Sequence, residues 1–274
     1  MPYIKTRDGT ELYVKDWGSG RPVVLIHGWP LSSDSWDPQA KALADAGFRA
    51  IAYDRRGFGR SAQPWSGYDY DTLSDDLADV LQETGAGADA TIVGFSMGGG
   101  EVARYMSRHE GKGVIAAGLI SSVVPYMLKT QDNPNGVPEE QLQAIGNGIK
   151  EDRFGFFQSF MKDFFGVGIV SHPVSQGTLD WAWGVSNMAG LKPILACAES
   201  FGHTDFRGDL PAFRVPTLVI HGTSDKTVPI DATGRPAAKG IAQSQLVEYD
   251  GAPHGLWATE CERFNKDLLT FLGR

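Results

Sequence analysis

A single serine between glycines, at the point where an apolar strand is followed by a helix, limits the possible folds of this chain more than any other feature. The stretch reads Thr91-Ile92-Val93-Gly94-Phe95-Ser96-Met97-Gly98-Gly99-Gly100, which is a β-branched run followed by the pattern G-x-S-x-G. Such a turn leaves no room for large side chains on either side of the serine, which explains Gly94 and Gly98. It raises the Ser96 hydroxyl above the sheet edge and directs the Met97 N–H towards the same point as the positive end of the helix. We interpret Ser96 as a nucleophile; the alternative is a glycine-rich turn with an incidental serine.

Strand-like and helix-like segments alternate along most of the chain. Continuous apolar runs at residues 23–26, 48–53, 114–120 and 217–220 are typical of strands buried on both faces of a parallel sheet. Amphipathic helical patterns lie between them, so we predict an α/β fold with a mostly parallel central sheet and helices on both faces. The site of such a fold lies at the carboxyl ends of the strands. One helix is expected to begin at Thr72, which has capping-box spacing with Asp75.

The alternation stops between residues 123 and 208. A turn-rich stretch at 130–138 is followed by helical patterns without intervening strands, among them Phe156, Phe157, Phe160 and Phe164. We predict a helical cap at residues 123–208, inserted into a core formed by residues 1–122 and 209–274. Most cap aromatics should pack against each other, and a minority should line a pocket.

Composition excludes several other classes of protein. With 25 basic and 33 acidic residues the net charge is −8, which argues against nucleic-acid and anionic-membrane partners. The apolar run 113–128 is broken by Pro125 and is too short to span a membrane, and residues 1–10 carry no apolar signal region. Cys197 and Cys261 form no motif, no histidine pair has metal-ligand spacing, and no dinucleotide fingerprint is present. We therefore expect a cytoplasmic protein with no metal and no organic cofactor.

Ser96 needs a base and an acid that orients the base. Of the six histidines, His254 lies in a Gly/Pro loop after a late strand, which can bring it back over the sheet edge. His27 and His221 end strands and are expected to brace their loops. Asp225 directly follows a strand and is the natural acid, although it is also a common turn former. The order Ser96, Asp225, His254 is the nucleophile–acid–base order of α/β-hydrolases.

The whole chain resembles an α/β-hydrolase, and within that superfamily it is similar to bacterial arylesterases, cofactor-free haloperoxidases (perhydrolases) and γ-lactamases. The following segments carry the resemblance: His27-Gly28-Trp29-Pro30, Tyr53-Asp54-Arg55-Arg56-Gly57-Phe58-Gly59-Arg60-Ser61, Gly94-Phe95-Ser96-Met97-Gly98-Gly99, Thr204-Asp205-Phe206-Arg207, His221-Gly222 with Asp225, and Ala252-Pro253-His254-Gly255. The resemblance implies Ser96 as nucleophile, Asp225 as acid and His254 as base, with the N–H groups of Trp29 and Met97 as the oxyanion hole.

The expected activity is hydrolysis of small carboxylic esters, with hydrogen peroxide able to replace water and give a peracid. Lactam or amide hydrolysis by the same residues is the nearest alternative, and a non-catalytic ligand-binding hydrolase fold is a more distant one. Dehalogenase and epoxide hydrolase chemistry would need an aspartate at position 96. The natural substrate and the oligomeric state, a homo-oligomer included, stay open. The substrate pocket is expected to be lined by Pro30, Val123, Met127, Phe160, Phe164, Thr227 and Val228.

Overall fold

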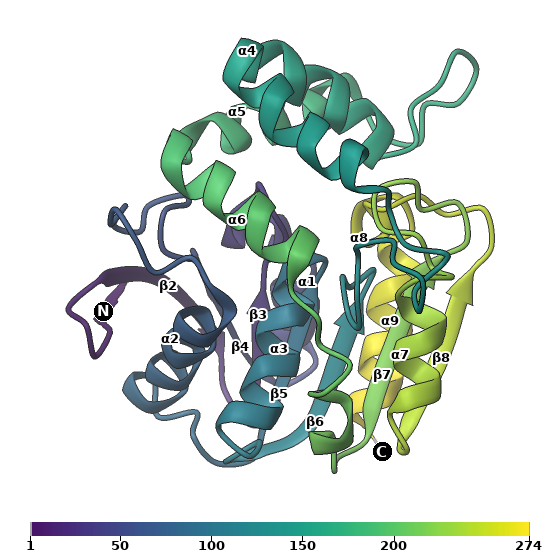
Figure 1. The fold of residues 1–274 in the computed structure, drawn as a ribbon. Helices are drawn as coiled ribbons and strands as arrows, with labels where there is room; N and C mark the ends of the chain where they lie inside the picture. Colours follow the sequence, from purple (N-terminus) through teal and green to yellow (C-terminus); the bar gives the residue numbers. More distant parts are fainter. Residues whose placement is uncertain (1, 274) are drawn as a thin grey trace.

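The computed structural model describes residues 2–273, which form a central sheet of eight strands flanked by helices (Figure 1). The strands are β1 Tyr3–Lys5, β2 Glu11–Gly18, β3 Pro22–Ile26, β4 Arg49–Tyr53, β5 Ala90–Phe95, β6 Val114–Ile120, β7 Thr217–Gly222 and β8 Ser244–Tyr249. The first two strands pair antiparallel to their neighbours, and the other six are parallel. The prediction of a mostly parallel α/β sheet is confirmed.

The strand order β1-β2-β4-β3-β5-β6-β7-β8 reverses direction at β3. The chain leaves β3 towards β4 on one side, and β5 pairs with β3 on the other side. The carboxyl ends of β3 and β5 are therefore neighbours at a topological switch point, where open α/β sheets bind ligands. This places the loop after β3 beside the turn at Ser96.

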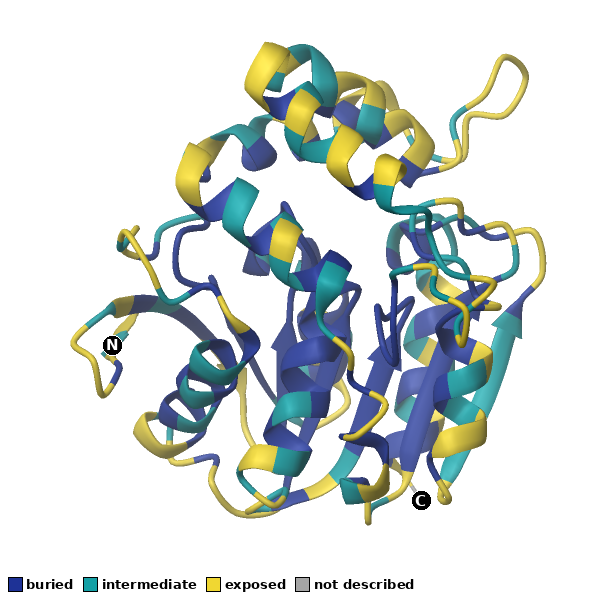
Figure 2. Ribbon diagram, in the orientation of Figure 1, coloured by how far each residue is buried: buried dark blue, intermediate teal, exposed yellow. Residues whose placement is uncertain are grey.

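Alternate side chains of the central strands enter two separate cores. Val24 and Ile26 belong to one core, and Val23 and Leu25 to the other, as the period of two in a strand requires. The first core is covered by α2 Tyr70–Glu83, α3 Met97–Arg108 and α7 Gly234–Gly240. The second is covered by α1 Asp37–Asp45, the short α8 Leu256–Thr259 and α9 Cys261–Leu272, with η1 Ser33–Trp36 before α1. The central strands β3, β4, β5 and β7 are buried on both faces, whereas the edge strand β8 is only partly buried (Figure 2).

Three helices between β6 and β7 lie across the carboxyl ends of the strands, at the top of Figure 1. They are α4 Glu139–Phe164, α5 Gln176–Met188 and α6 Leu191–His203, and the short η2 Leu210–Ala212 follows. Helix α4 is bent at Asp152, whose φ of −147° and ψ of 89° are not helical, and the Asp152 carboxylate accepts a hydrogen bond from the Gly155 N–H. The outward faces of α4, α5 and α6 are exposed (Figure 2).

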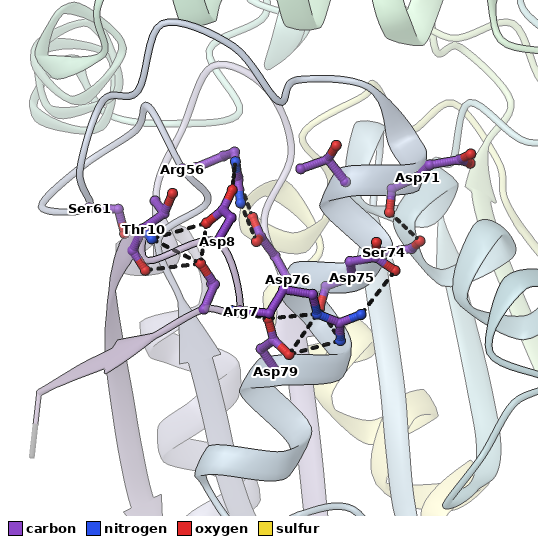
Figure 3. A network of polar contacts seen from close by, with 12 residues as sticks. Arg7, Asp8, Thr10, Arg56, Ser61, Asp71, Ser74, Asp75, Asp76 and Asp79 are labelled. Carbon is purple, nitrogen blue, oxygen red and sulfur yellow. Dashed lines mark hydrogen bonds and ion pairs between the residues drawn. The ribbon is translucent and has the colours of Figure 1, made fainter.

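Ion pairs connect the segment after β4 to the rest of the core. Arg56 donates two hydrogen bonds, of 2.6 and 2.5 Å, to the Asp76 carboxylate on α2, and it also reaches Asp8 (Figure 3). Burial raises the pKa of Asp76 to about 6, against the opposing effect of Arg56. Within the segment itself, the Arg60 backbone N–H and its Nε each donate to the Asp54 carboxylate at 2.8 Å. These contacts fix a loop that has no regular structure of its own.

The expected capping box at the start of α2 is wrong. The helix begins at Tyr70, and its N-cap is Asp69, whose carboxylate accepts a hydrogen bond from the Thr72 N–H at 2.9 Å. Asp75 instead pairs with Arg108 and His109 at the end of α3. Aspartate is a strong N-cap residue, and a tertiary ion pair occupies the carboxylate that a capping box would use.

Candidate active site

Ser96 occupies a strained turn between β5 and α3. Its φ of 53° and ψ of −119° lie outside the regions that residues with a side chain usually adopt. The turn also needs glycine nearby: a Cβ on Gly94 would lie 2.3 Å from the Gly98 carbonyl oxygen, and one on Gly98 would lie 2.6 Å from that of Ile26. This close packing holds the strained serine in place, with only 6% of its surface exposed.

The loop after β8 brings His254 to Ser96. The Nε2 atom of His254 lies 2.9 Å from Ser96 Oγ, and the histidine is 1% exposed. Its ring packs against Phe95 and Phe164, with ring centroids 4.9 Å away in each case. The imidazole is therefore held in one orientation, from which Nε2 can take the hydroxyl proton.

Asp225, in the loop after β7, accepts a hydrogen bond from His254 Nδ1 at 2.7 Å through Oδ2. Its other oxygen accepts the N–H groups of Thr227 at 2.9 Å and Val228 at 2.8 Å. Burial by itself would raise the pKa of Asp225, but His254 and His221 hold it well below its usual range. The carboxylate is thus ionised and aligned, as an acid that orients a catalytic histidine must be.

Two backbone donors face the serine from different segments. Met97 is the first residue of α3, and Trp29 follows β3 and its Gly28. Within the described residues neither N–H has a hydrogen-bond partner of its own. A Cβ on Gly28 would lie 2.6 Å from the Phe95 ring and 3.0 Å from Ser96 Cβ, so glycine at this position lets the loop approach Ser96. Both donors are free to bind an oxyanion.

A small cavity of about 50 Å³ lies over Ser96. Of the seven predicted pocket residues, five line it: Val123, Met127, Phe160, Thr227 and Val228. Pro30 and Phe164 are not among its lining residues. Phe164 is fully buried and packs on the His254 ring, so it supports the base from behind.

Trp29 also lines the cavity, and sequence reasoning missed four of its apolar residues: Val137, Leu142, Ile145 and Phe201. Leu142 and Ile145 belong to the helical pattern of the cap, and their shared face of α4 was the available signal. Phe201 lies at the end of α6 and packs edge-on against Trp29, at 5.4 Å between ring centroids. No local pattern indicates that contact.

The remaining strand-end histidines brace their loops. His221 Nε2 lies 2.9 Å from the Val228 carbonyl oxygen, and His27 Nδ1 lies 2.9 Å from the Gly28 carbonyl oxygen. Over residues 2–273 the structure contains no group of three or more side chains that could hold a metal ion. In the same residues no helix is both long and apolar enough to cross a membrane.

The sheet, the strained serine turn and the Ser–His–Asp arrangement define the class of protein. The chain belongs to the α/β-hydrolase fold family, whose family model matches residues 21–258. It is 46% identical over 276 residues to a non-heme chloroperoxidase of Kitasatospora aureofaciens, and the match covers 100% of both chains. It is 41% identical to a bifunctional esterase/perhydrolase of Acinetobacter calcoaceticus, over 99% of each chain. A bromoperoxidase from Bacillus anthracis has a similar crystal structure, with a TM-score of 0.95, 42% identity, and coverage of 99% of this chain and 100% of that one.

Proposed function

We propose that this protein is a carboxylic ester hydrolase that acts through an acyl-enzyme on Ser96. The observation that carries the proposal is the pair of contacts of 2.9 and 2.7 Å that join Ser96, His254 and Asp225 beneath a small apolar cavity. His254 takes the hydroxyl proton as Ser96 Oγ attacks the ester carbonyl, and the N–H groups of Trp29 and Met97 bind the oxyanion. The alcohol leaves with the proton from His254, and water then releases the acid from Ser96.

Hydrogen peroxide in place of water gives a second reaction on the same acyl-enzyme. Its oxygen attacks the acyl carbonyl, one peroxide proton passes through His254 to Ser96 Oγ as the Ser96–acyl bond breaks, and the products are a peracid and the free serine. The peracid then oxidises a halide ion in solution, which gives hypohalous acid and the carboxylate. The O–O bond of the peroxide supplies the oxidising equivalent. The residues that hydrolyse esters can therefore also carry out perhydrolysis. The relatives named as chloroperoxidase and esterase/perhydrolase support this pairing of activities.

The size of the cavity favours esters with small acyl groups as substrates. A water molecule needs a cavity volume of about 10–15 Å³. The cavity of about 50 Å³ over Ser96 therefore accommodates a group of roughly acetyl size. Aromatic and aliphatic side chains line it, which suits an apolar acyl chain. A cytoplasmic location stays a prediction from the sequence, and the oligomeric state stays open.

A panel of substrates on the purified protein tests the proposal. Phenyl acetate and p-nitrophenyl acetate should be hydrolysed with a burst of one phenol per active site, and acetic acid with peroxide and bromide should brominate monochlorodimedone. Exhaustive chelation should leave ester hydrolysis unchanged. Turnover of a γ-lactam without turnover of any ester would favour lactam hydrolysis instead. Absence of both a burst and steady turnover with these activated esters would favour a ligand-binding role.

A further inference from the structure

A chain of buried polar groups connects the two segments that carry the oxyanion donors. It runs from Glu101 on α3 through Arg55, which follows β4, to His27, which follows β3. Glu101 and His27 are 0% exposed and Arg55 is 1% exposed. Burying three polar side chains is costly unless every group has a partner. None of the three touches the cavity over Ser96, so the reaction described above does not use them directly.

The partners of His27 decide which of its nitrogens carries the proton. Its Nε2 lies 3.0 Å from the backbone nitrogen of Arg55, which can only donate, so Nε2 is the acceptor. Burial, with Arg55 nearby, lowers the pKa of His27 to about 3, so the ring is neutral and carries one proton. That proton is on Nδ1, which lies 2.9 Å from the Gly28 carbonyl oxygen. The contact of 3.4 Å between Nδ1 and the Arg55 side chain would need the opposite tautomer, and it is the longer and weaker one.

The Gly28 carbonyl belongs to the same peptide group as the Trp29 N–H. It accepts hydrogen bonds from His27 Nδ1 and from the Leu31 N–H, the latter at 3.0 Å. A hydrogen bond to the carbonyl of a peptide polarises its N–H, and each such bond strengthens the next by roughly 10–30%. The bond from His27 therefore fixes the plane of this peptide and makes the Trp29 N–H a better donor.

Arg55 connects this peptide to the helix that carries the other donor. Its Nη2 donates to the His27 carbonyl oxygen at 2.6 Å, and its Nε donates to Glu101 Oε1 at 2.5 Å. The Tyr53 hydroxyl donates to the other Glu101 oxygen at 2.7 Å. Glu101 is on α3, whose first residue is Met97. The distance between the two oxyanion donors is thus set by a fully paired buried network.

We propose that His27 is a positioning residue of the oxyanion hole: Arg55 holds it in the Nδ1-protonated tautomer, from which it orients and polarises the Gly28–Trp29 peptide. This inference rests on the proposed function. It also implies a role for Arg55 and Glu101, which hold the loop after β3 in a fixed position relative to α3.

Two variants separate the hydrogen bonds of His27. In His27→Asn the amide nitrogen can take the place of Nδ1 and still donate to the Gly28 carbonyl, while the contact to the Arg55 N–H is lost. In His27→Gln the longer amide can take the place of Nε2 and accept from the Arg55 N–H, while the bond to Gly28 is lost. Each loses one buried hydrogen bond, so urea unfolding should show a similar loss of stability in both. That makes each variant the matched control of the other.

The readouts are p-nitrophenyl acetate kinetics and the affinity of phenylboronic acid. Ser96 Oγ adds to boron, its proton passes to His254, and the anionic boronate places an oxygen in the oxyanion hole. We expect His27→Asn to stay within about threefold of the wild type. His27→Gln should lower kcat by about tenfold with KM nearly unchanged, and should weaken boronate binding by a similar factor. Equal kcat in the two variants would overturn the inference. So would losses of kcat that only parallel each variant's loss of unfolding free energy.

The tautomer is read directly by ¹⁵N NMR of the resting, histidine-labelled protein. A proton on His27 Nε2 would overturn the inference even if neither variant folds, and a proton on Nδ1 is the expected result. A wild-type protein that binds the boronate but hydrolyses no ester would refute the proposed function alone, and the boronate affinities would still decide the role of His27. A wild-type protein that does neither would refute both.

Discussion

The Oγ atom of Ser96 and the Nε2 atom of His254 lie 2.9 Å apart, although 158 positions separate the two residues in the chain. Both groups are almost entirely buried, so water competes little for either partner. The ring of His254 is fixed from behind by Phe164 and at its other nitrogen by Asp225. This fixed geometry is what allows proton transfer without rearrangement.

Replacing the nucleophile should abolish most of the activity. Ser96→Ala is expected to lower kcat for phenyl acetate by on the order of 10⁴–10⁶, because within residues 2–273 Ser96 Oγ is the hydroxyl that is hydrogen-bonded to His254. Steady-state kinetics checks this, with circular dichroism to confirm folding. Ser74→Ala is the matched control, since Ser74 is also buried and its hydroxyl only donates to Asp71 within α2. A Ser96→Ala protein with more than about a tenth of wild-type activity would contradict the assignment.

Asp225 should also contribute to stability in a pH-dependent way. Because its folded-state pKa lies below the ordinary value of 3.8, the stabilisation is fully present above that value and is lost as the pH falls towards the folded-state pKa. The difference in unfolding free energy between wild type and Asp225→Asn should therefore be constant from pH 7 to 5 and should narrow below about pH 4. Urea unfolding measures it.

The exposed Glu110, substituted as Glu110→Gln, is the control for general acid effects. The difference in unfolding free energy between Glu110→Gln and wild type should stay small over the same pH range. An Asp225→Asn difference that does not change with pH would show that the carboxylate is not held ionised by its two histidine neighbours.

The size of the cavity should set acyl-chain preference. The wild-type protein is expected to prefer p-nitrophenyl acetate to longer esters, and Phe160→Ala should favour butyrate relative to acetate by about tenfold. Two additional buried CH₂ groups contribute about 1.6 kcal/mol, which gives that factor. The ratio of kcat/KM values measures it.

Phe156→Ala is the control for this experiment, because Phe156 stacks on Phe160 at 5.8 Å between ring centroids without lining the cavity. Its selectivity should stay close to that of the wild type. A wild-type kcat/KM that rises from acetate to octanoate would instead indicate an open, lipase-like groove.

Pro30 should shift the balance between peroxide and water. Proline restricts the backbone of the residue before it, so Pro30 limits how the Trp29 carbonyl is oriented near the oxyanion hole. Peroxide has one more donor than the attacking group uses, and that carbonyl can accept it. Pro30→Leu should lower the ratio of perhydrolysis to hydrolysis roughly tenfold, which needs about 1.4 kcal/mol. Both reactions are measured on one preparation; equal losses in both would leave Pro30 as a loop brace.

Short-range patterns in the sequence were sufficient to predict the fold class and to select three residues that the fold brings into hydrogen-bond contact. The pattern Gly94-x-Ser96-x-Gly98 after a β-branched strand specifies a tight strand-to-helix turn, because only glycine fits where the Gly94 and Gly98 backbones pass within contact distance. Asp225 and His254 lie in the loops after β7 and β8, and the carboxyl ends of parallel strands share one edge of the sheet. The sheet topology therefore brings residues that are far apart in the sequence close together in space.

Tertiary packing decided what no local pattern encodes. Phe164 and Phe160 belong to one helix and one aromatic run, yet Phe164 supports the His254 ring while Phe160 faces the cavity. Asp69, not Thr72, caps α2 because Asp75 is taken by Arg108 and His109. The tautomer of His27 depends on a backbone N–H 28 positions away. The sequence by itself determined which backbone turns must form, since those follow from steric limits on neighbouring residues. The direction of each side chain and the place of each proton depend on partners that only the folded chain brings into contact.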